Sequence, residues 1–136
     1  FPNPDQEHGA KGLEWNNGHL YIMGWTTNKI YQMDMQGKLV KEIDLDYGAG
    51  GGLAFDGQHF WVPCDGICEF SEEGKLIGKI YPASEGTWDL TWEPANNAFG
   101  GYLWASQRAN ENWYDDAKIF KLEILDDQMA LNTQAP

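Results

Sequence analysis

The chain has 136 residues, of which 14% are aromatic and 22% are charged, and its formal net charge is −12 at pH 7. A surface this acidic repels phosphate backbones and anionic lipid headgroups. We therefore expect neither nucleic acid nor an anionic membrane as a partner. No apolar run approaches the roughly 20 residues of a membrane span. A cation, a neutral glycan or a basic peptide remains compatible with this charge.

The first group of predicted strands occupies residues 12–50. It opens with Gly12-Leu13-Glu14-Trp15 and continues through short apolar runs at residues 20–22, 30–33 and 39–45. Short runs rich in β-branched and aromatic residues, separated by turn residues, are typical of β-strands. We therefore predict four consecutive strands in this part of the chain.

The second group, residues 51–86, repeats the same order. Gly52-Leu53-Ala54-Phe55 matches the opening of the first group 40 residues later, and runs at residues 60–62, 67–70 and 76–81 follow. The turn at residues 71–75 matches the turn at residues 34–38, and both end in Gly-Lys. Four short strands at a period of about 40 residues are typical of a β-propeller blade.

The third group, residues 87–125, departs from this order. Asp89-Leu90-Thr91-Trp92 opens it, and apolar runs at residues 103–105 and 119–122 follow. It carries an insertion at residues 94–100 and a long loop at residues 106–116, and it lacks the turn and fourth strand of the other groups. We therefore predict an incomplete last unit, with residues 1–11 and 126–136 as terminal segments.

These repeats predict an all-β, single-domain chain, residues 1–136, built from three four-stranded β-propeller blades, which is half of a propeller. An immunoglobulin-like sandwich would also contain short strands, but it would not repeat one four-strand order along the chain. Propellers close with typically 4–8 blades, so three blades do not form a ring.

The repeated Gly-Leu-x-Trp, Leu-Tyr-Ile and Lys-Ile-Tyr-Gln-Met-Asp segments resemble the YVTN/NHL/quinoprotein-like propeller repeats. The segment at residues 85–91 is also similar to the Glu-Gly-x-Gly-Leu-Thr segment of glutamine-cyclotransferase-like propellers. This second resemblance implies that Glu85 transfers a proton and that Trp88 forms a pocket wall. Asp89 occupies the position where that family has glycine, and this difference weakens the hypothesis that Glu85 is catalytic.

Repetition separates scaffold residues from candidate site residues. Two sets of equivalent aromatic residues recur in all three groups and are predicted to lie in the core: Trp15, Phe55 and Trp92 in one set, and Tyr21, Trp61 and Trp104 in the other.

Three tryptophans lie outside the repeat: Trp25, Trp88 and Trp113. In a blade, the loops that join strands two and three lie on the same face as the connections between blades. This topology places the three tryptophans on one face, together with Tyr47, Glu85 and Asp89. Binding residues concentrate on the loops of rigid scaffolds, so we predict a binding face here. The alternative is that these aromatic residues only pack the loops down.

Carboxylates are predicted to gather on the same face: Asp65, Glu85, Asp89, Glu111, Asp115 and Asp116. Together with Asn110 and Asn112 they offer oxygen ligands of the kind that Ca²⁺ takes. No spacing among them matches a calcium loop, so we expect no cofactor and keep Ca²⁺ as the alternative.

Cys64 and Cys68 flank a three-residue segment that we predict to be a hairpin loop. The two residues would then face each other across an antiparallel pair, within reach of a disulfide. A disulfide favours an exported protein, secreted, periplasmic or on the cell surface, whereas two free thiols would favour the cytosol. The chain begins at Phe1, as a processed product would.

The expected function follows from the open ends. Three blades leave two blade faces uncovered, both expected to be broad and apolar, and residues 1–11 look too short to cover one of them. We therefore expect a homo-oligomeric interaction or structural module, either two copies in a six-bladed ring or an extended assembly. The alternatives are an enzyme of the cyclotransferase-like or lactonase-like kind and a glycan-binding lectin. The chain could also be a fragment of a longer propeller.

Overall fold

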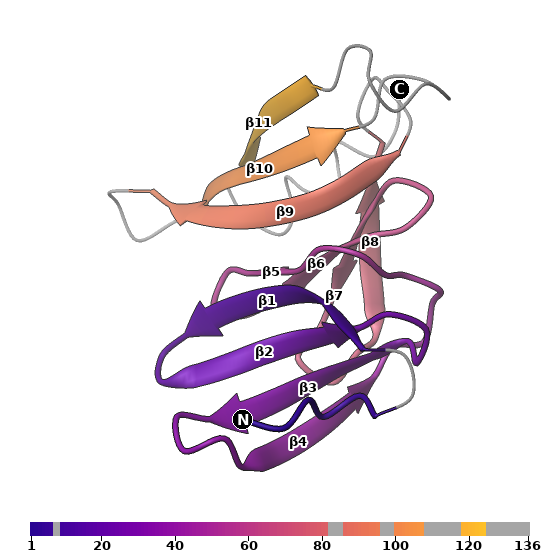
Figure 1. Ribbon diagram of the computed structural model, residues 1–136. Helices are drawn as coiled ribbons and strands as arrows, with labels where there is room; N and C mark the ends of the chain where they lie inside the picture. The colour runs from indigo at the N-terminus through magenta and orange to yellow at the C-terminus, as the bar shows by residue number, and fades with distance from the viewer. Residues whose placement is uncertain (7–8, 82–85, 96–99, 108–117, 125–136) are drawn as a thin grey trace.

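The computed structural model describes residues 1–6, 9–81, 86–95, 100–107 and 118–124. In these ranges the regular structure is entirely β, as the repeats predict, and no helix is present that could cross a membrane. The strands form three antiparallel sheets, each following the order of the chain (Figure 1).

Each sheet corresponds to one of the three sequence groups. Sheet 1 contains β1 (Ala10–Asn16), β2 (His19–Gly24), β3 (Lys29–Asp34) and β4 (Leu39–Asp44). Sheet 2 contains β5 (Ala54–Phe55), β6 (Phe60–Pro63), β7 (Ile67–Phe70) and β8 (Leu76–Ile80). Sheet 3 contains β9 (Thr87–Pro94), β10 (Gly101–Gln107) and β11 (Lys118–Ile124). Sheet 3 thus has three strands in the described part of the chain, in keeping with the incomplete last unit.

Local turn chemistry explains the hairpins. Asn17 and Gly18 join β1 to β2 with φ values of 46° and 79°, as a two-residue hairpin turn requires. In the β3–β4 turn, Asp34 Oδ1 accepts hydrogen bonds from the backbone N–H groups of Gln36 and Lys38. Ser71 Oγ accepts the equivalent pair in the β7–β8 turn, so the matching turn sequences form matching structures.

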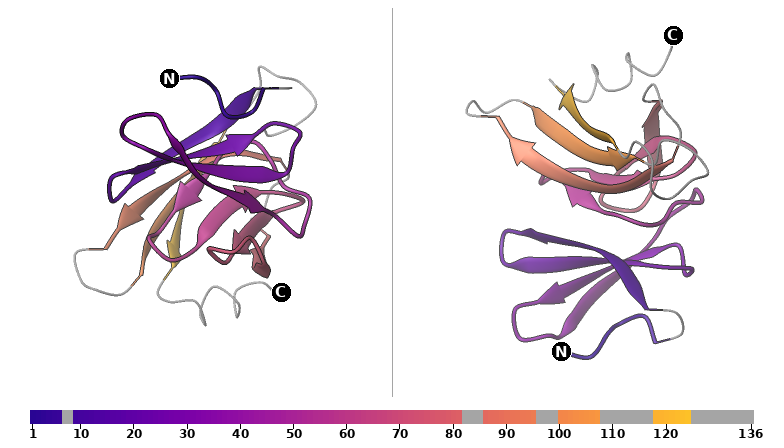
Figure 2. Two further views of the ribbon diagram at one scale, coloured as in Figure 1. Left: turned by 90° about the horizontal axis from the view of Figure 1, so that it is seen from below. Right: turned by 45° about the horizontal axis from the view of Figure 1, so that its top comes forward.

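Sheet 2 lies between sheet 1 and sheet 3 (Figure 2). One core cluster fills the space between sheets 1 and 2, and it includes Tyr21, Met23, Phe55 and Phe70. A second cluster, which includes Trp61 and Leu103, fills the space between sheets 2 and 3. Sheet 2 therefore contributes alternate side chains to sheet 1 on one side and to sheet 3 on the other, as a blade inside a propeller does.

The core positions of the repeated aromatic residues are only partly as predicted. Phe55, Tyr21 and Trp61 are buried and Trp92 packs against the second cluster, but Trp15 and Trp104 are exposed. Trp15 lies on the face of sheet 1 that points away from sheet 2, and Trp104 lies on the equivalent outer face of sheet 3. No sheet covers either face in the described structure, so the prediction of burial is wrong for these two residues.

The N-terminal residues cover part of the outer face of sheet 1. The Phe1 ring lies against Gly37 in the β3–β4 turn, and Asp5, which is buried, accepts a hydrogen bond of 3.4 Å from Thr27 beyond the end of β2. A small cluster of Ile22, Tyr31 and Met33 is buried on this face. The expectation that residues 1–11 are too short to cover a sheet face is therefore wrong in part, although Leu13 and Trp15 stay exposed.

The outer face of sheet 3 carries charged and polar side chains beside its apolar ones. Asp89, Thr91 and Glu93 of β9 are exposed there, beside Trp104. The Trp104 indole N–H donates a hydrogen bond of 2.6 Å to Glu93 Oε2, and Lys121 pairs with the same carboxylate at 3.4 Å. Ile119 is exposed on the same face, so the described part of sheet 3 presents a mixed outer face rather than the broad apolar face that was expected.

Candidate binding site on the loop face

A cleft of about 570 Å³ opens among the loops that join β2 to β3 and β6 to β7 and the connections between the sheets. These are the loops that the blade topology predicts on a common face. The lining residues come from all three sheets: Lys11, Trp25, Gly48, Ala49, Gly50, Gly51, Pro63, Cys64, Gly86, Thr87 and Trp88.

Lys11 is held between two indole rings in this cleft. Its Nζ atom lies 2.9 Å from the ring centroid of Trp25 and 5.3 Å from that of Trp88. An ammonium group over an indole face is attracted by the ring quadrupole. Trp25 is 50% exposed and Trp88 is 40% exposed, so both rings remain partly open to solvent.

Backbone contacts fix the floor of the cleft. The Gly50 N–H donates to Pro63 O at 2.9 Å, and the Gly52 N–H donates to Trp88 O at 2.9 Å. A Cβ atom on Gly51, which has a φ of 112°, would stand 3.0 Å from Trp88 O. The glycine-rich connection at residues 48–52 thus lets the backbone of sheet 2 approach sheet 3 closely.

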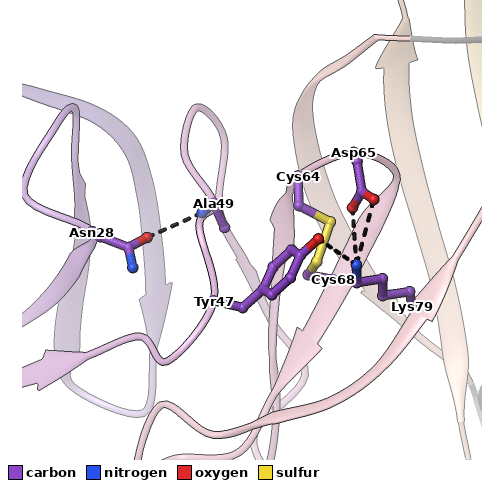
Figure 3. The surroundings of a disulfide bond; sticks show 7 residues. All are labelled: Asn28, Tyr47, Ala49, Cys64, Asp65, Cys68 and Lys79. Atoms are coloured by element: carbon purple, nitrogen blue, oxygen red, sulfur yellow. Dashed lines mark hydrogen bonds and ion pairs between the residues drawn. A yellow bond between two sulfur atoms is a disulfide. The ribbon is translucent and has the colours of Figure 1, made fainter.

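Asn28 anchors the same connection from the other side. Its backbone has a φ of 56°, its Nδ2 donates to Leu45 O at 2.9 Å, and its Oδ1 accepts from the Ala49 N–H at 3.0 Å (Figure 3). Asparagine tolerates this left-handed conformation better than most residues. One side chain thereby links the β2–β3 loop to the start of the connection that forms the cleft floor.

A disulfide joins Cys64 and Cys68, whose Cα atoms are 5.9 Å apart (Figure 3). Lys79 lies beside it, where it donates a hydrogen bond to the Tyr47 hydroxyl and pairs with Asp65 at 3.2 Å. Cys64, Asp65 and Cys68 lie close enough to share a metal ion, but the two sulfur atoms are bonded to each other. A metal site here would require the reduced thiols.

Two carboxylates come from innermost strands. Glu14 lies on β1 and is half-buried, and Asp89 lies on β9. Burial, together with the nearby negative charge of Asp89, raises the pKa of the Glu14 carboxyl to about 7. Such a group exchanges a proton near neutral pH, which is a requirement for general acid–base chemistry.

No protein-family model matches the chain, and no curated protein matches it either. Among solved structures, the chain is similar to virginiamycin B lyase from Staphylococcus aureus, with 17% sequence identity and a TM-score of 0.52. The match covers 89% of this chain and 43% of that one, so the chain spans less than half the length of its structural neighbour. The fold is propeller-like.

The structure brings together some of the predicted site residues. Trp25 and Trp88 line the cleft, whereas Tyr47 contacts Lys79 and packs against the core between sheets 1 and 2. Asp89 lies one residue beyond the cleft and accepts a hydrogen bond from its neighbour Leu90. Glu85 and Trp113 lie outside the described residues, as do the predicted calcium ligands Glu111, Asp115 and Asp116.

Sequence reasoning missed Lys11 and Glu14. Lys11 directly precedes the repeated Gly-Leu-x-aromatic segment and so lies on the loop face by the same topology that placed the tryptophans. Glu14 occupies a position held by Ala54 in the second group and Thr91 in the third, so it departs from the repeat. Comparison of the repeats at every position, rather than at the aromatic ones alone, would have identified it.

Proposed function

We propose that this chain is a β-propeller interaction module, with three sheets that act as blades, and that it assembles with a second copy through the outer face of sheet 1. The observation that carries the proposal is the exposure of Leu13 and Trp15, at 63% and 60%. Their equivalents in sheet 2, Leu53 and Phe55, are 1% and 4% exposed because sheet 1 covers them. In the described structure no sheet packs against the equivalent residues of sheet 1, Leu13 and Trp15.

The hydrophobic effect favours such a cover. Burial of apolar surface contributes about 25 cal/mol per Å², and the exposed Leu13 and Trp15 adjoin the cluster of Ile22, Tyr31 and Met33 that the N-terminal residues already shield. An exposed apolar surface of this kind is typical of a contact with another protein.

The two end faces favour a face-to-face dimer over a six-bladed ring. In a ring, the outer face of sheet 3 would meet the outer face of sheet 1, and Asp89 and Glu93 would be buried against leucine and tryptophan. Removal of a charged carboxylate from water is costly even where the carboxylate is paired, as Glu93 is with Trp104 and Lys121. A two-fold contact between two copies of the sheet 1 face avoids this cost, and two-fold dimers are the commonest protein assemblies.

Analytical ultracentrifugation of the chain at micromolar concentrations tests this proposal. We expect a dimer, and we expect Leu13→Asp to convert it to a monomer while Ile119→Asp, on the outer face of sheet 3, leaves it intact. If both variants dissociate the assembly, the ring or an extended head-to-tail assembly is correct instead. A chain that stays monomeric throughout contradicts the proposal.

We also propose that the protein works in an oxidising compartment: secreted, periplasmic or at the cell surface. The Cys64–Cys68 disulfide supports this location, because disulfides persist mainly outside the reducing cytosol. Thiol titration of protein recovered without reductant tests it. Two free thiols in the native protein would contradict it.

A second candidate function is catalysis at the innermost strands, and Glu14 favours it. With a pKa of about 7, Glu14 is suited to move a proton at neutral pH, and the structurally similar protein is described as a lyase. Incubation with virginiamycin B, followed by chromatography, tests this candidate. Turnover that is lost in Glu14→Gln and retained in a variant at the dimer face would support it, and absence of turnover would count against this substrate.

A further inference from the structure

We propose that the cleft between Trp25 and Trp88 binds an acidic saccharide, with a uronic-acid carboxylate on Lys11 and the sugar ring against an indole. The proposal goes beyond assembly through sheet 1, because the cleft lies on the loop face and not on the outer face of that sheet. It assigns a role to Lys11 as well as to the two exposed tryptophans.

The charge of the lining favours an anion. Lys11 is the single charged side chain among the described lining residues, although the chain as a whole carries 21 acidic and 9 basic residues. Lys29, Lys79 and Lys121 each pair with a carboxylate. Lys11 forms no such pair in the described structure and contacts only indole rings, so its ammonium keeps its N–H donors for a ligand.

The lining is also suited to a sugar ring. Trp25 and Trp88 line the cleft and are 50% and 40% exposed, and a flat indole face packs well against the C–H face of a pyranose. Glycines at positions 48, 50, 51 and 86 line the remainder and leave room beside the rings. The volume of about 570 Å³ lies within the range of small-molecule sites, roughly 300–1,000 Å³.

The cleft is largely preorganised. The connection at residues 48–52 is fixed by three hydrogen bonds: Ala49 N–H to Asn28, Gly50 N–H to Pro63 O and Gly52 N–H to Trp88 O. The disulfide closes the adjacent β6–β7 loop. The two indoles already hold the Lys11 ammonium in place. Binding therefore orders few groups, which reduces its entropic cost.

Other ligand classes fit less well. A basic peptide would bring like charge to Lys11, and a neutral glycan would offer the ammonium hydroxyl acceptors but no opposite charge. A polyphosphate would carry several negative charges toward a protein of net charge −12, which repels it. A single carboxylate on a sugar ring gains the local attraction with less of this repulsion.

Isothermal titration with galacturonic acid, which carries one carboxylate, and with its methyl ester tests the proposal. The ester keeps the sugar ring and removes the charge. We expect the acid to bind at least tenfold more tightly than the ester. Added salt should weaken binding of the acid more than binding of the ester. Equal binding of the two forms, or binding of neither, overturns the proposal.

Variants assign the contacts. Lys11→Gln should reduce binding of the acid to the level of the ester, whereas Lys11→Arg should largely preserve it, and Trp25→Ala should weaken both forms. Trp104→Ala is the matched control, because this tryptophan is exposed on the outer face of sheet 3, away from the cleft and from the proposed dimer face. Lys11 is an exposed side chain, so its variants should fold, which circular dichroism verifies. If Lys11→Gln binds the acid as tightly as the parent chain does, the proposed site is wrong.

Discussion

Gly52 lies directly against Asp89, so closely that a Cβ atom at position 52 would overlap the Asp89 backbone and stand 2.8 Å from the Leu90 nitrogen. Gly12 lies against Gly52 in the same way, with a Cβ position 2.8 Å from the Leu53 nitrogen. The first residue of each repeated segment thus marks the point where one innermost strand approaches the next. In the third repeat this position is Asp89, on the outer face of sheet 3, where no described strand follows.

Replacement of Gly52 by alanine should destabilise the fold. The added methyl group meets the Asp89 carboxylate, which could turn away, and also the Asp89 Cα and Leu90 N backbone atoms, which cannot. We therefore expect the free energy of unfolding to fall by about 1–3 kcal/mol. Urea denaturation measures the change. Gly48→Ala is the control, because a Cβ atom there meets nothing within 4 Å, and it should change stability by no more than about 0.5 kcal/mol. Equal effects of the two substitutions would contradict this account of the repeated glycine.

Asn28→Ala should lower the free energy of unfolding by more than Asn17→Ala does. Both residues have positive φ values, 56° and 46°, so both substitutions incur a backbone cost of about 1–2 kcal/mol. Asn28 also loses its bonds to Leu45 and Ala49, which adds about 1 kcal/mol or more. The difference in unfolding free energy between the two variants isolates the side-chain bonds. A difference near zero would mean that Asn28 does not anchor the connection.

Glu14 should make stability decrease as the pH rises. Its pKa is raised from 4.5 to about 7 in the folded chain, so between these values the folded state binds a proton that the unfolded state has lost, and unfolding becomes easier with increasing pH. The group is only half-buried and partly screened by water, so we expect an effect on the order of 1–2 kcal/mol. Urea denaturation at pH 5 and pH 8 measures it.

The control for this pH effect is the Glu14→Gln variant, which cannot titrate. The difference in stability between the parent chain and Glu14→Gln should shift in favour of the variant as the pH rises from 5 to 8. Asp89→Asn should reduce the dependence, because the Asp89 charge is one cause of the raised pKa. A difference that stays constant with pH would show that Glu14 has an ordinary pKa.

Reduction of the Cys64–Cys68 disulfide should lower the free energy of unfolding by about 2 kcal/mol, the loop-closure value for a ring this short. Denaturation with and without a phosphine reductant measures this change. The Cys64→Ala/Cys68→Ala double variant should show the reduced stability in both conditions. If the reductant also destabilises the double variant, the effect does not arise from this disulfide.

The sequence alone determined the β class, the three groups of strands and the hairpin turns, because these depend on local patterns. Asn17-Gly18 and the paired turns at residues 34–38 and 71–75 specify their hairpins through side-chain and backbone preferences that act over a few residues. The repeat also separated Trp25 and Trp88 from the scaffold, since a packed position recurs in every sheet and a loop residue does not.

Tertiary structure decided what the repeat could not. Trp15 and Trp104 carry the same pattern as their buried equivalents, yet burial depends on whether another sheet lies against that face, and this is not encoded in the strand itself. The contact of Lys11 with two indoles, the raised pKa of Glu14 and the cover formed by Phe1 and Asp5 each join residues far apart along the chain. Local patterns predict strands and turns. The environment of a charged group or an aromatic ring depends on residues that are distant in the sequence, so only the folded structure defines it.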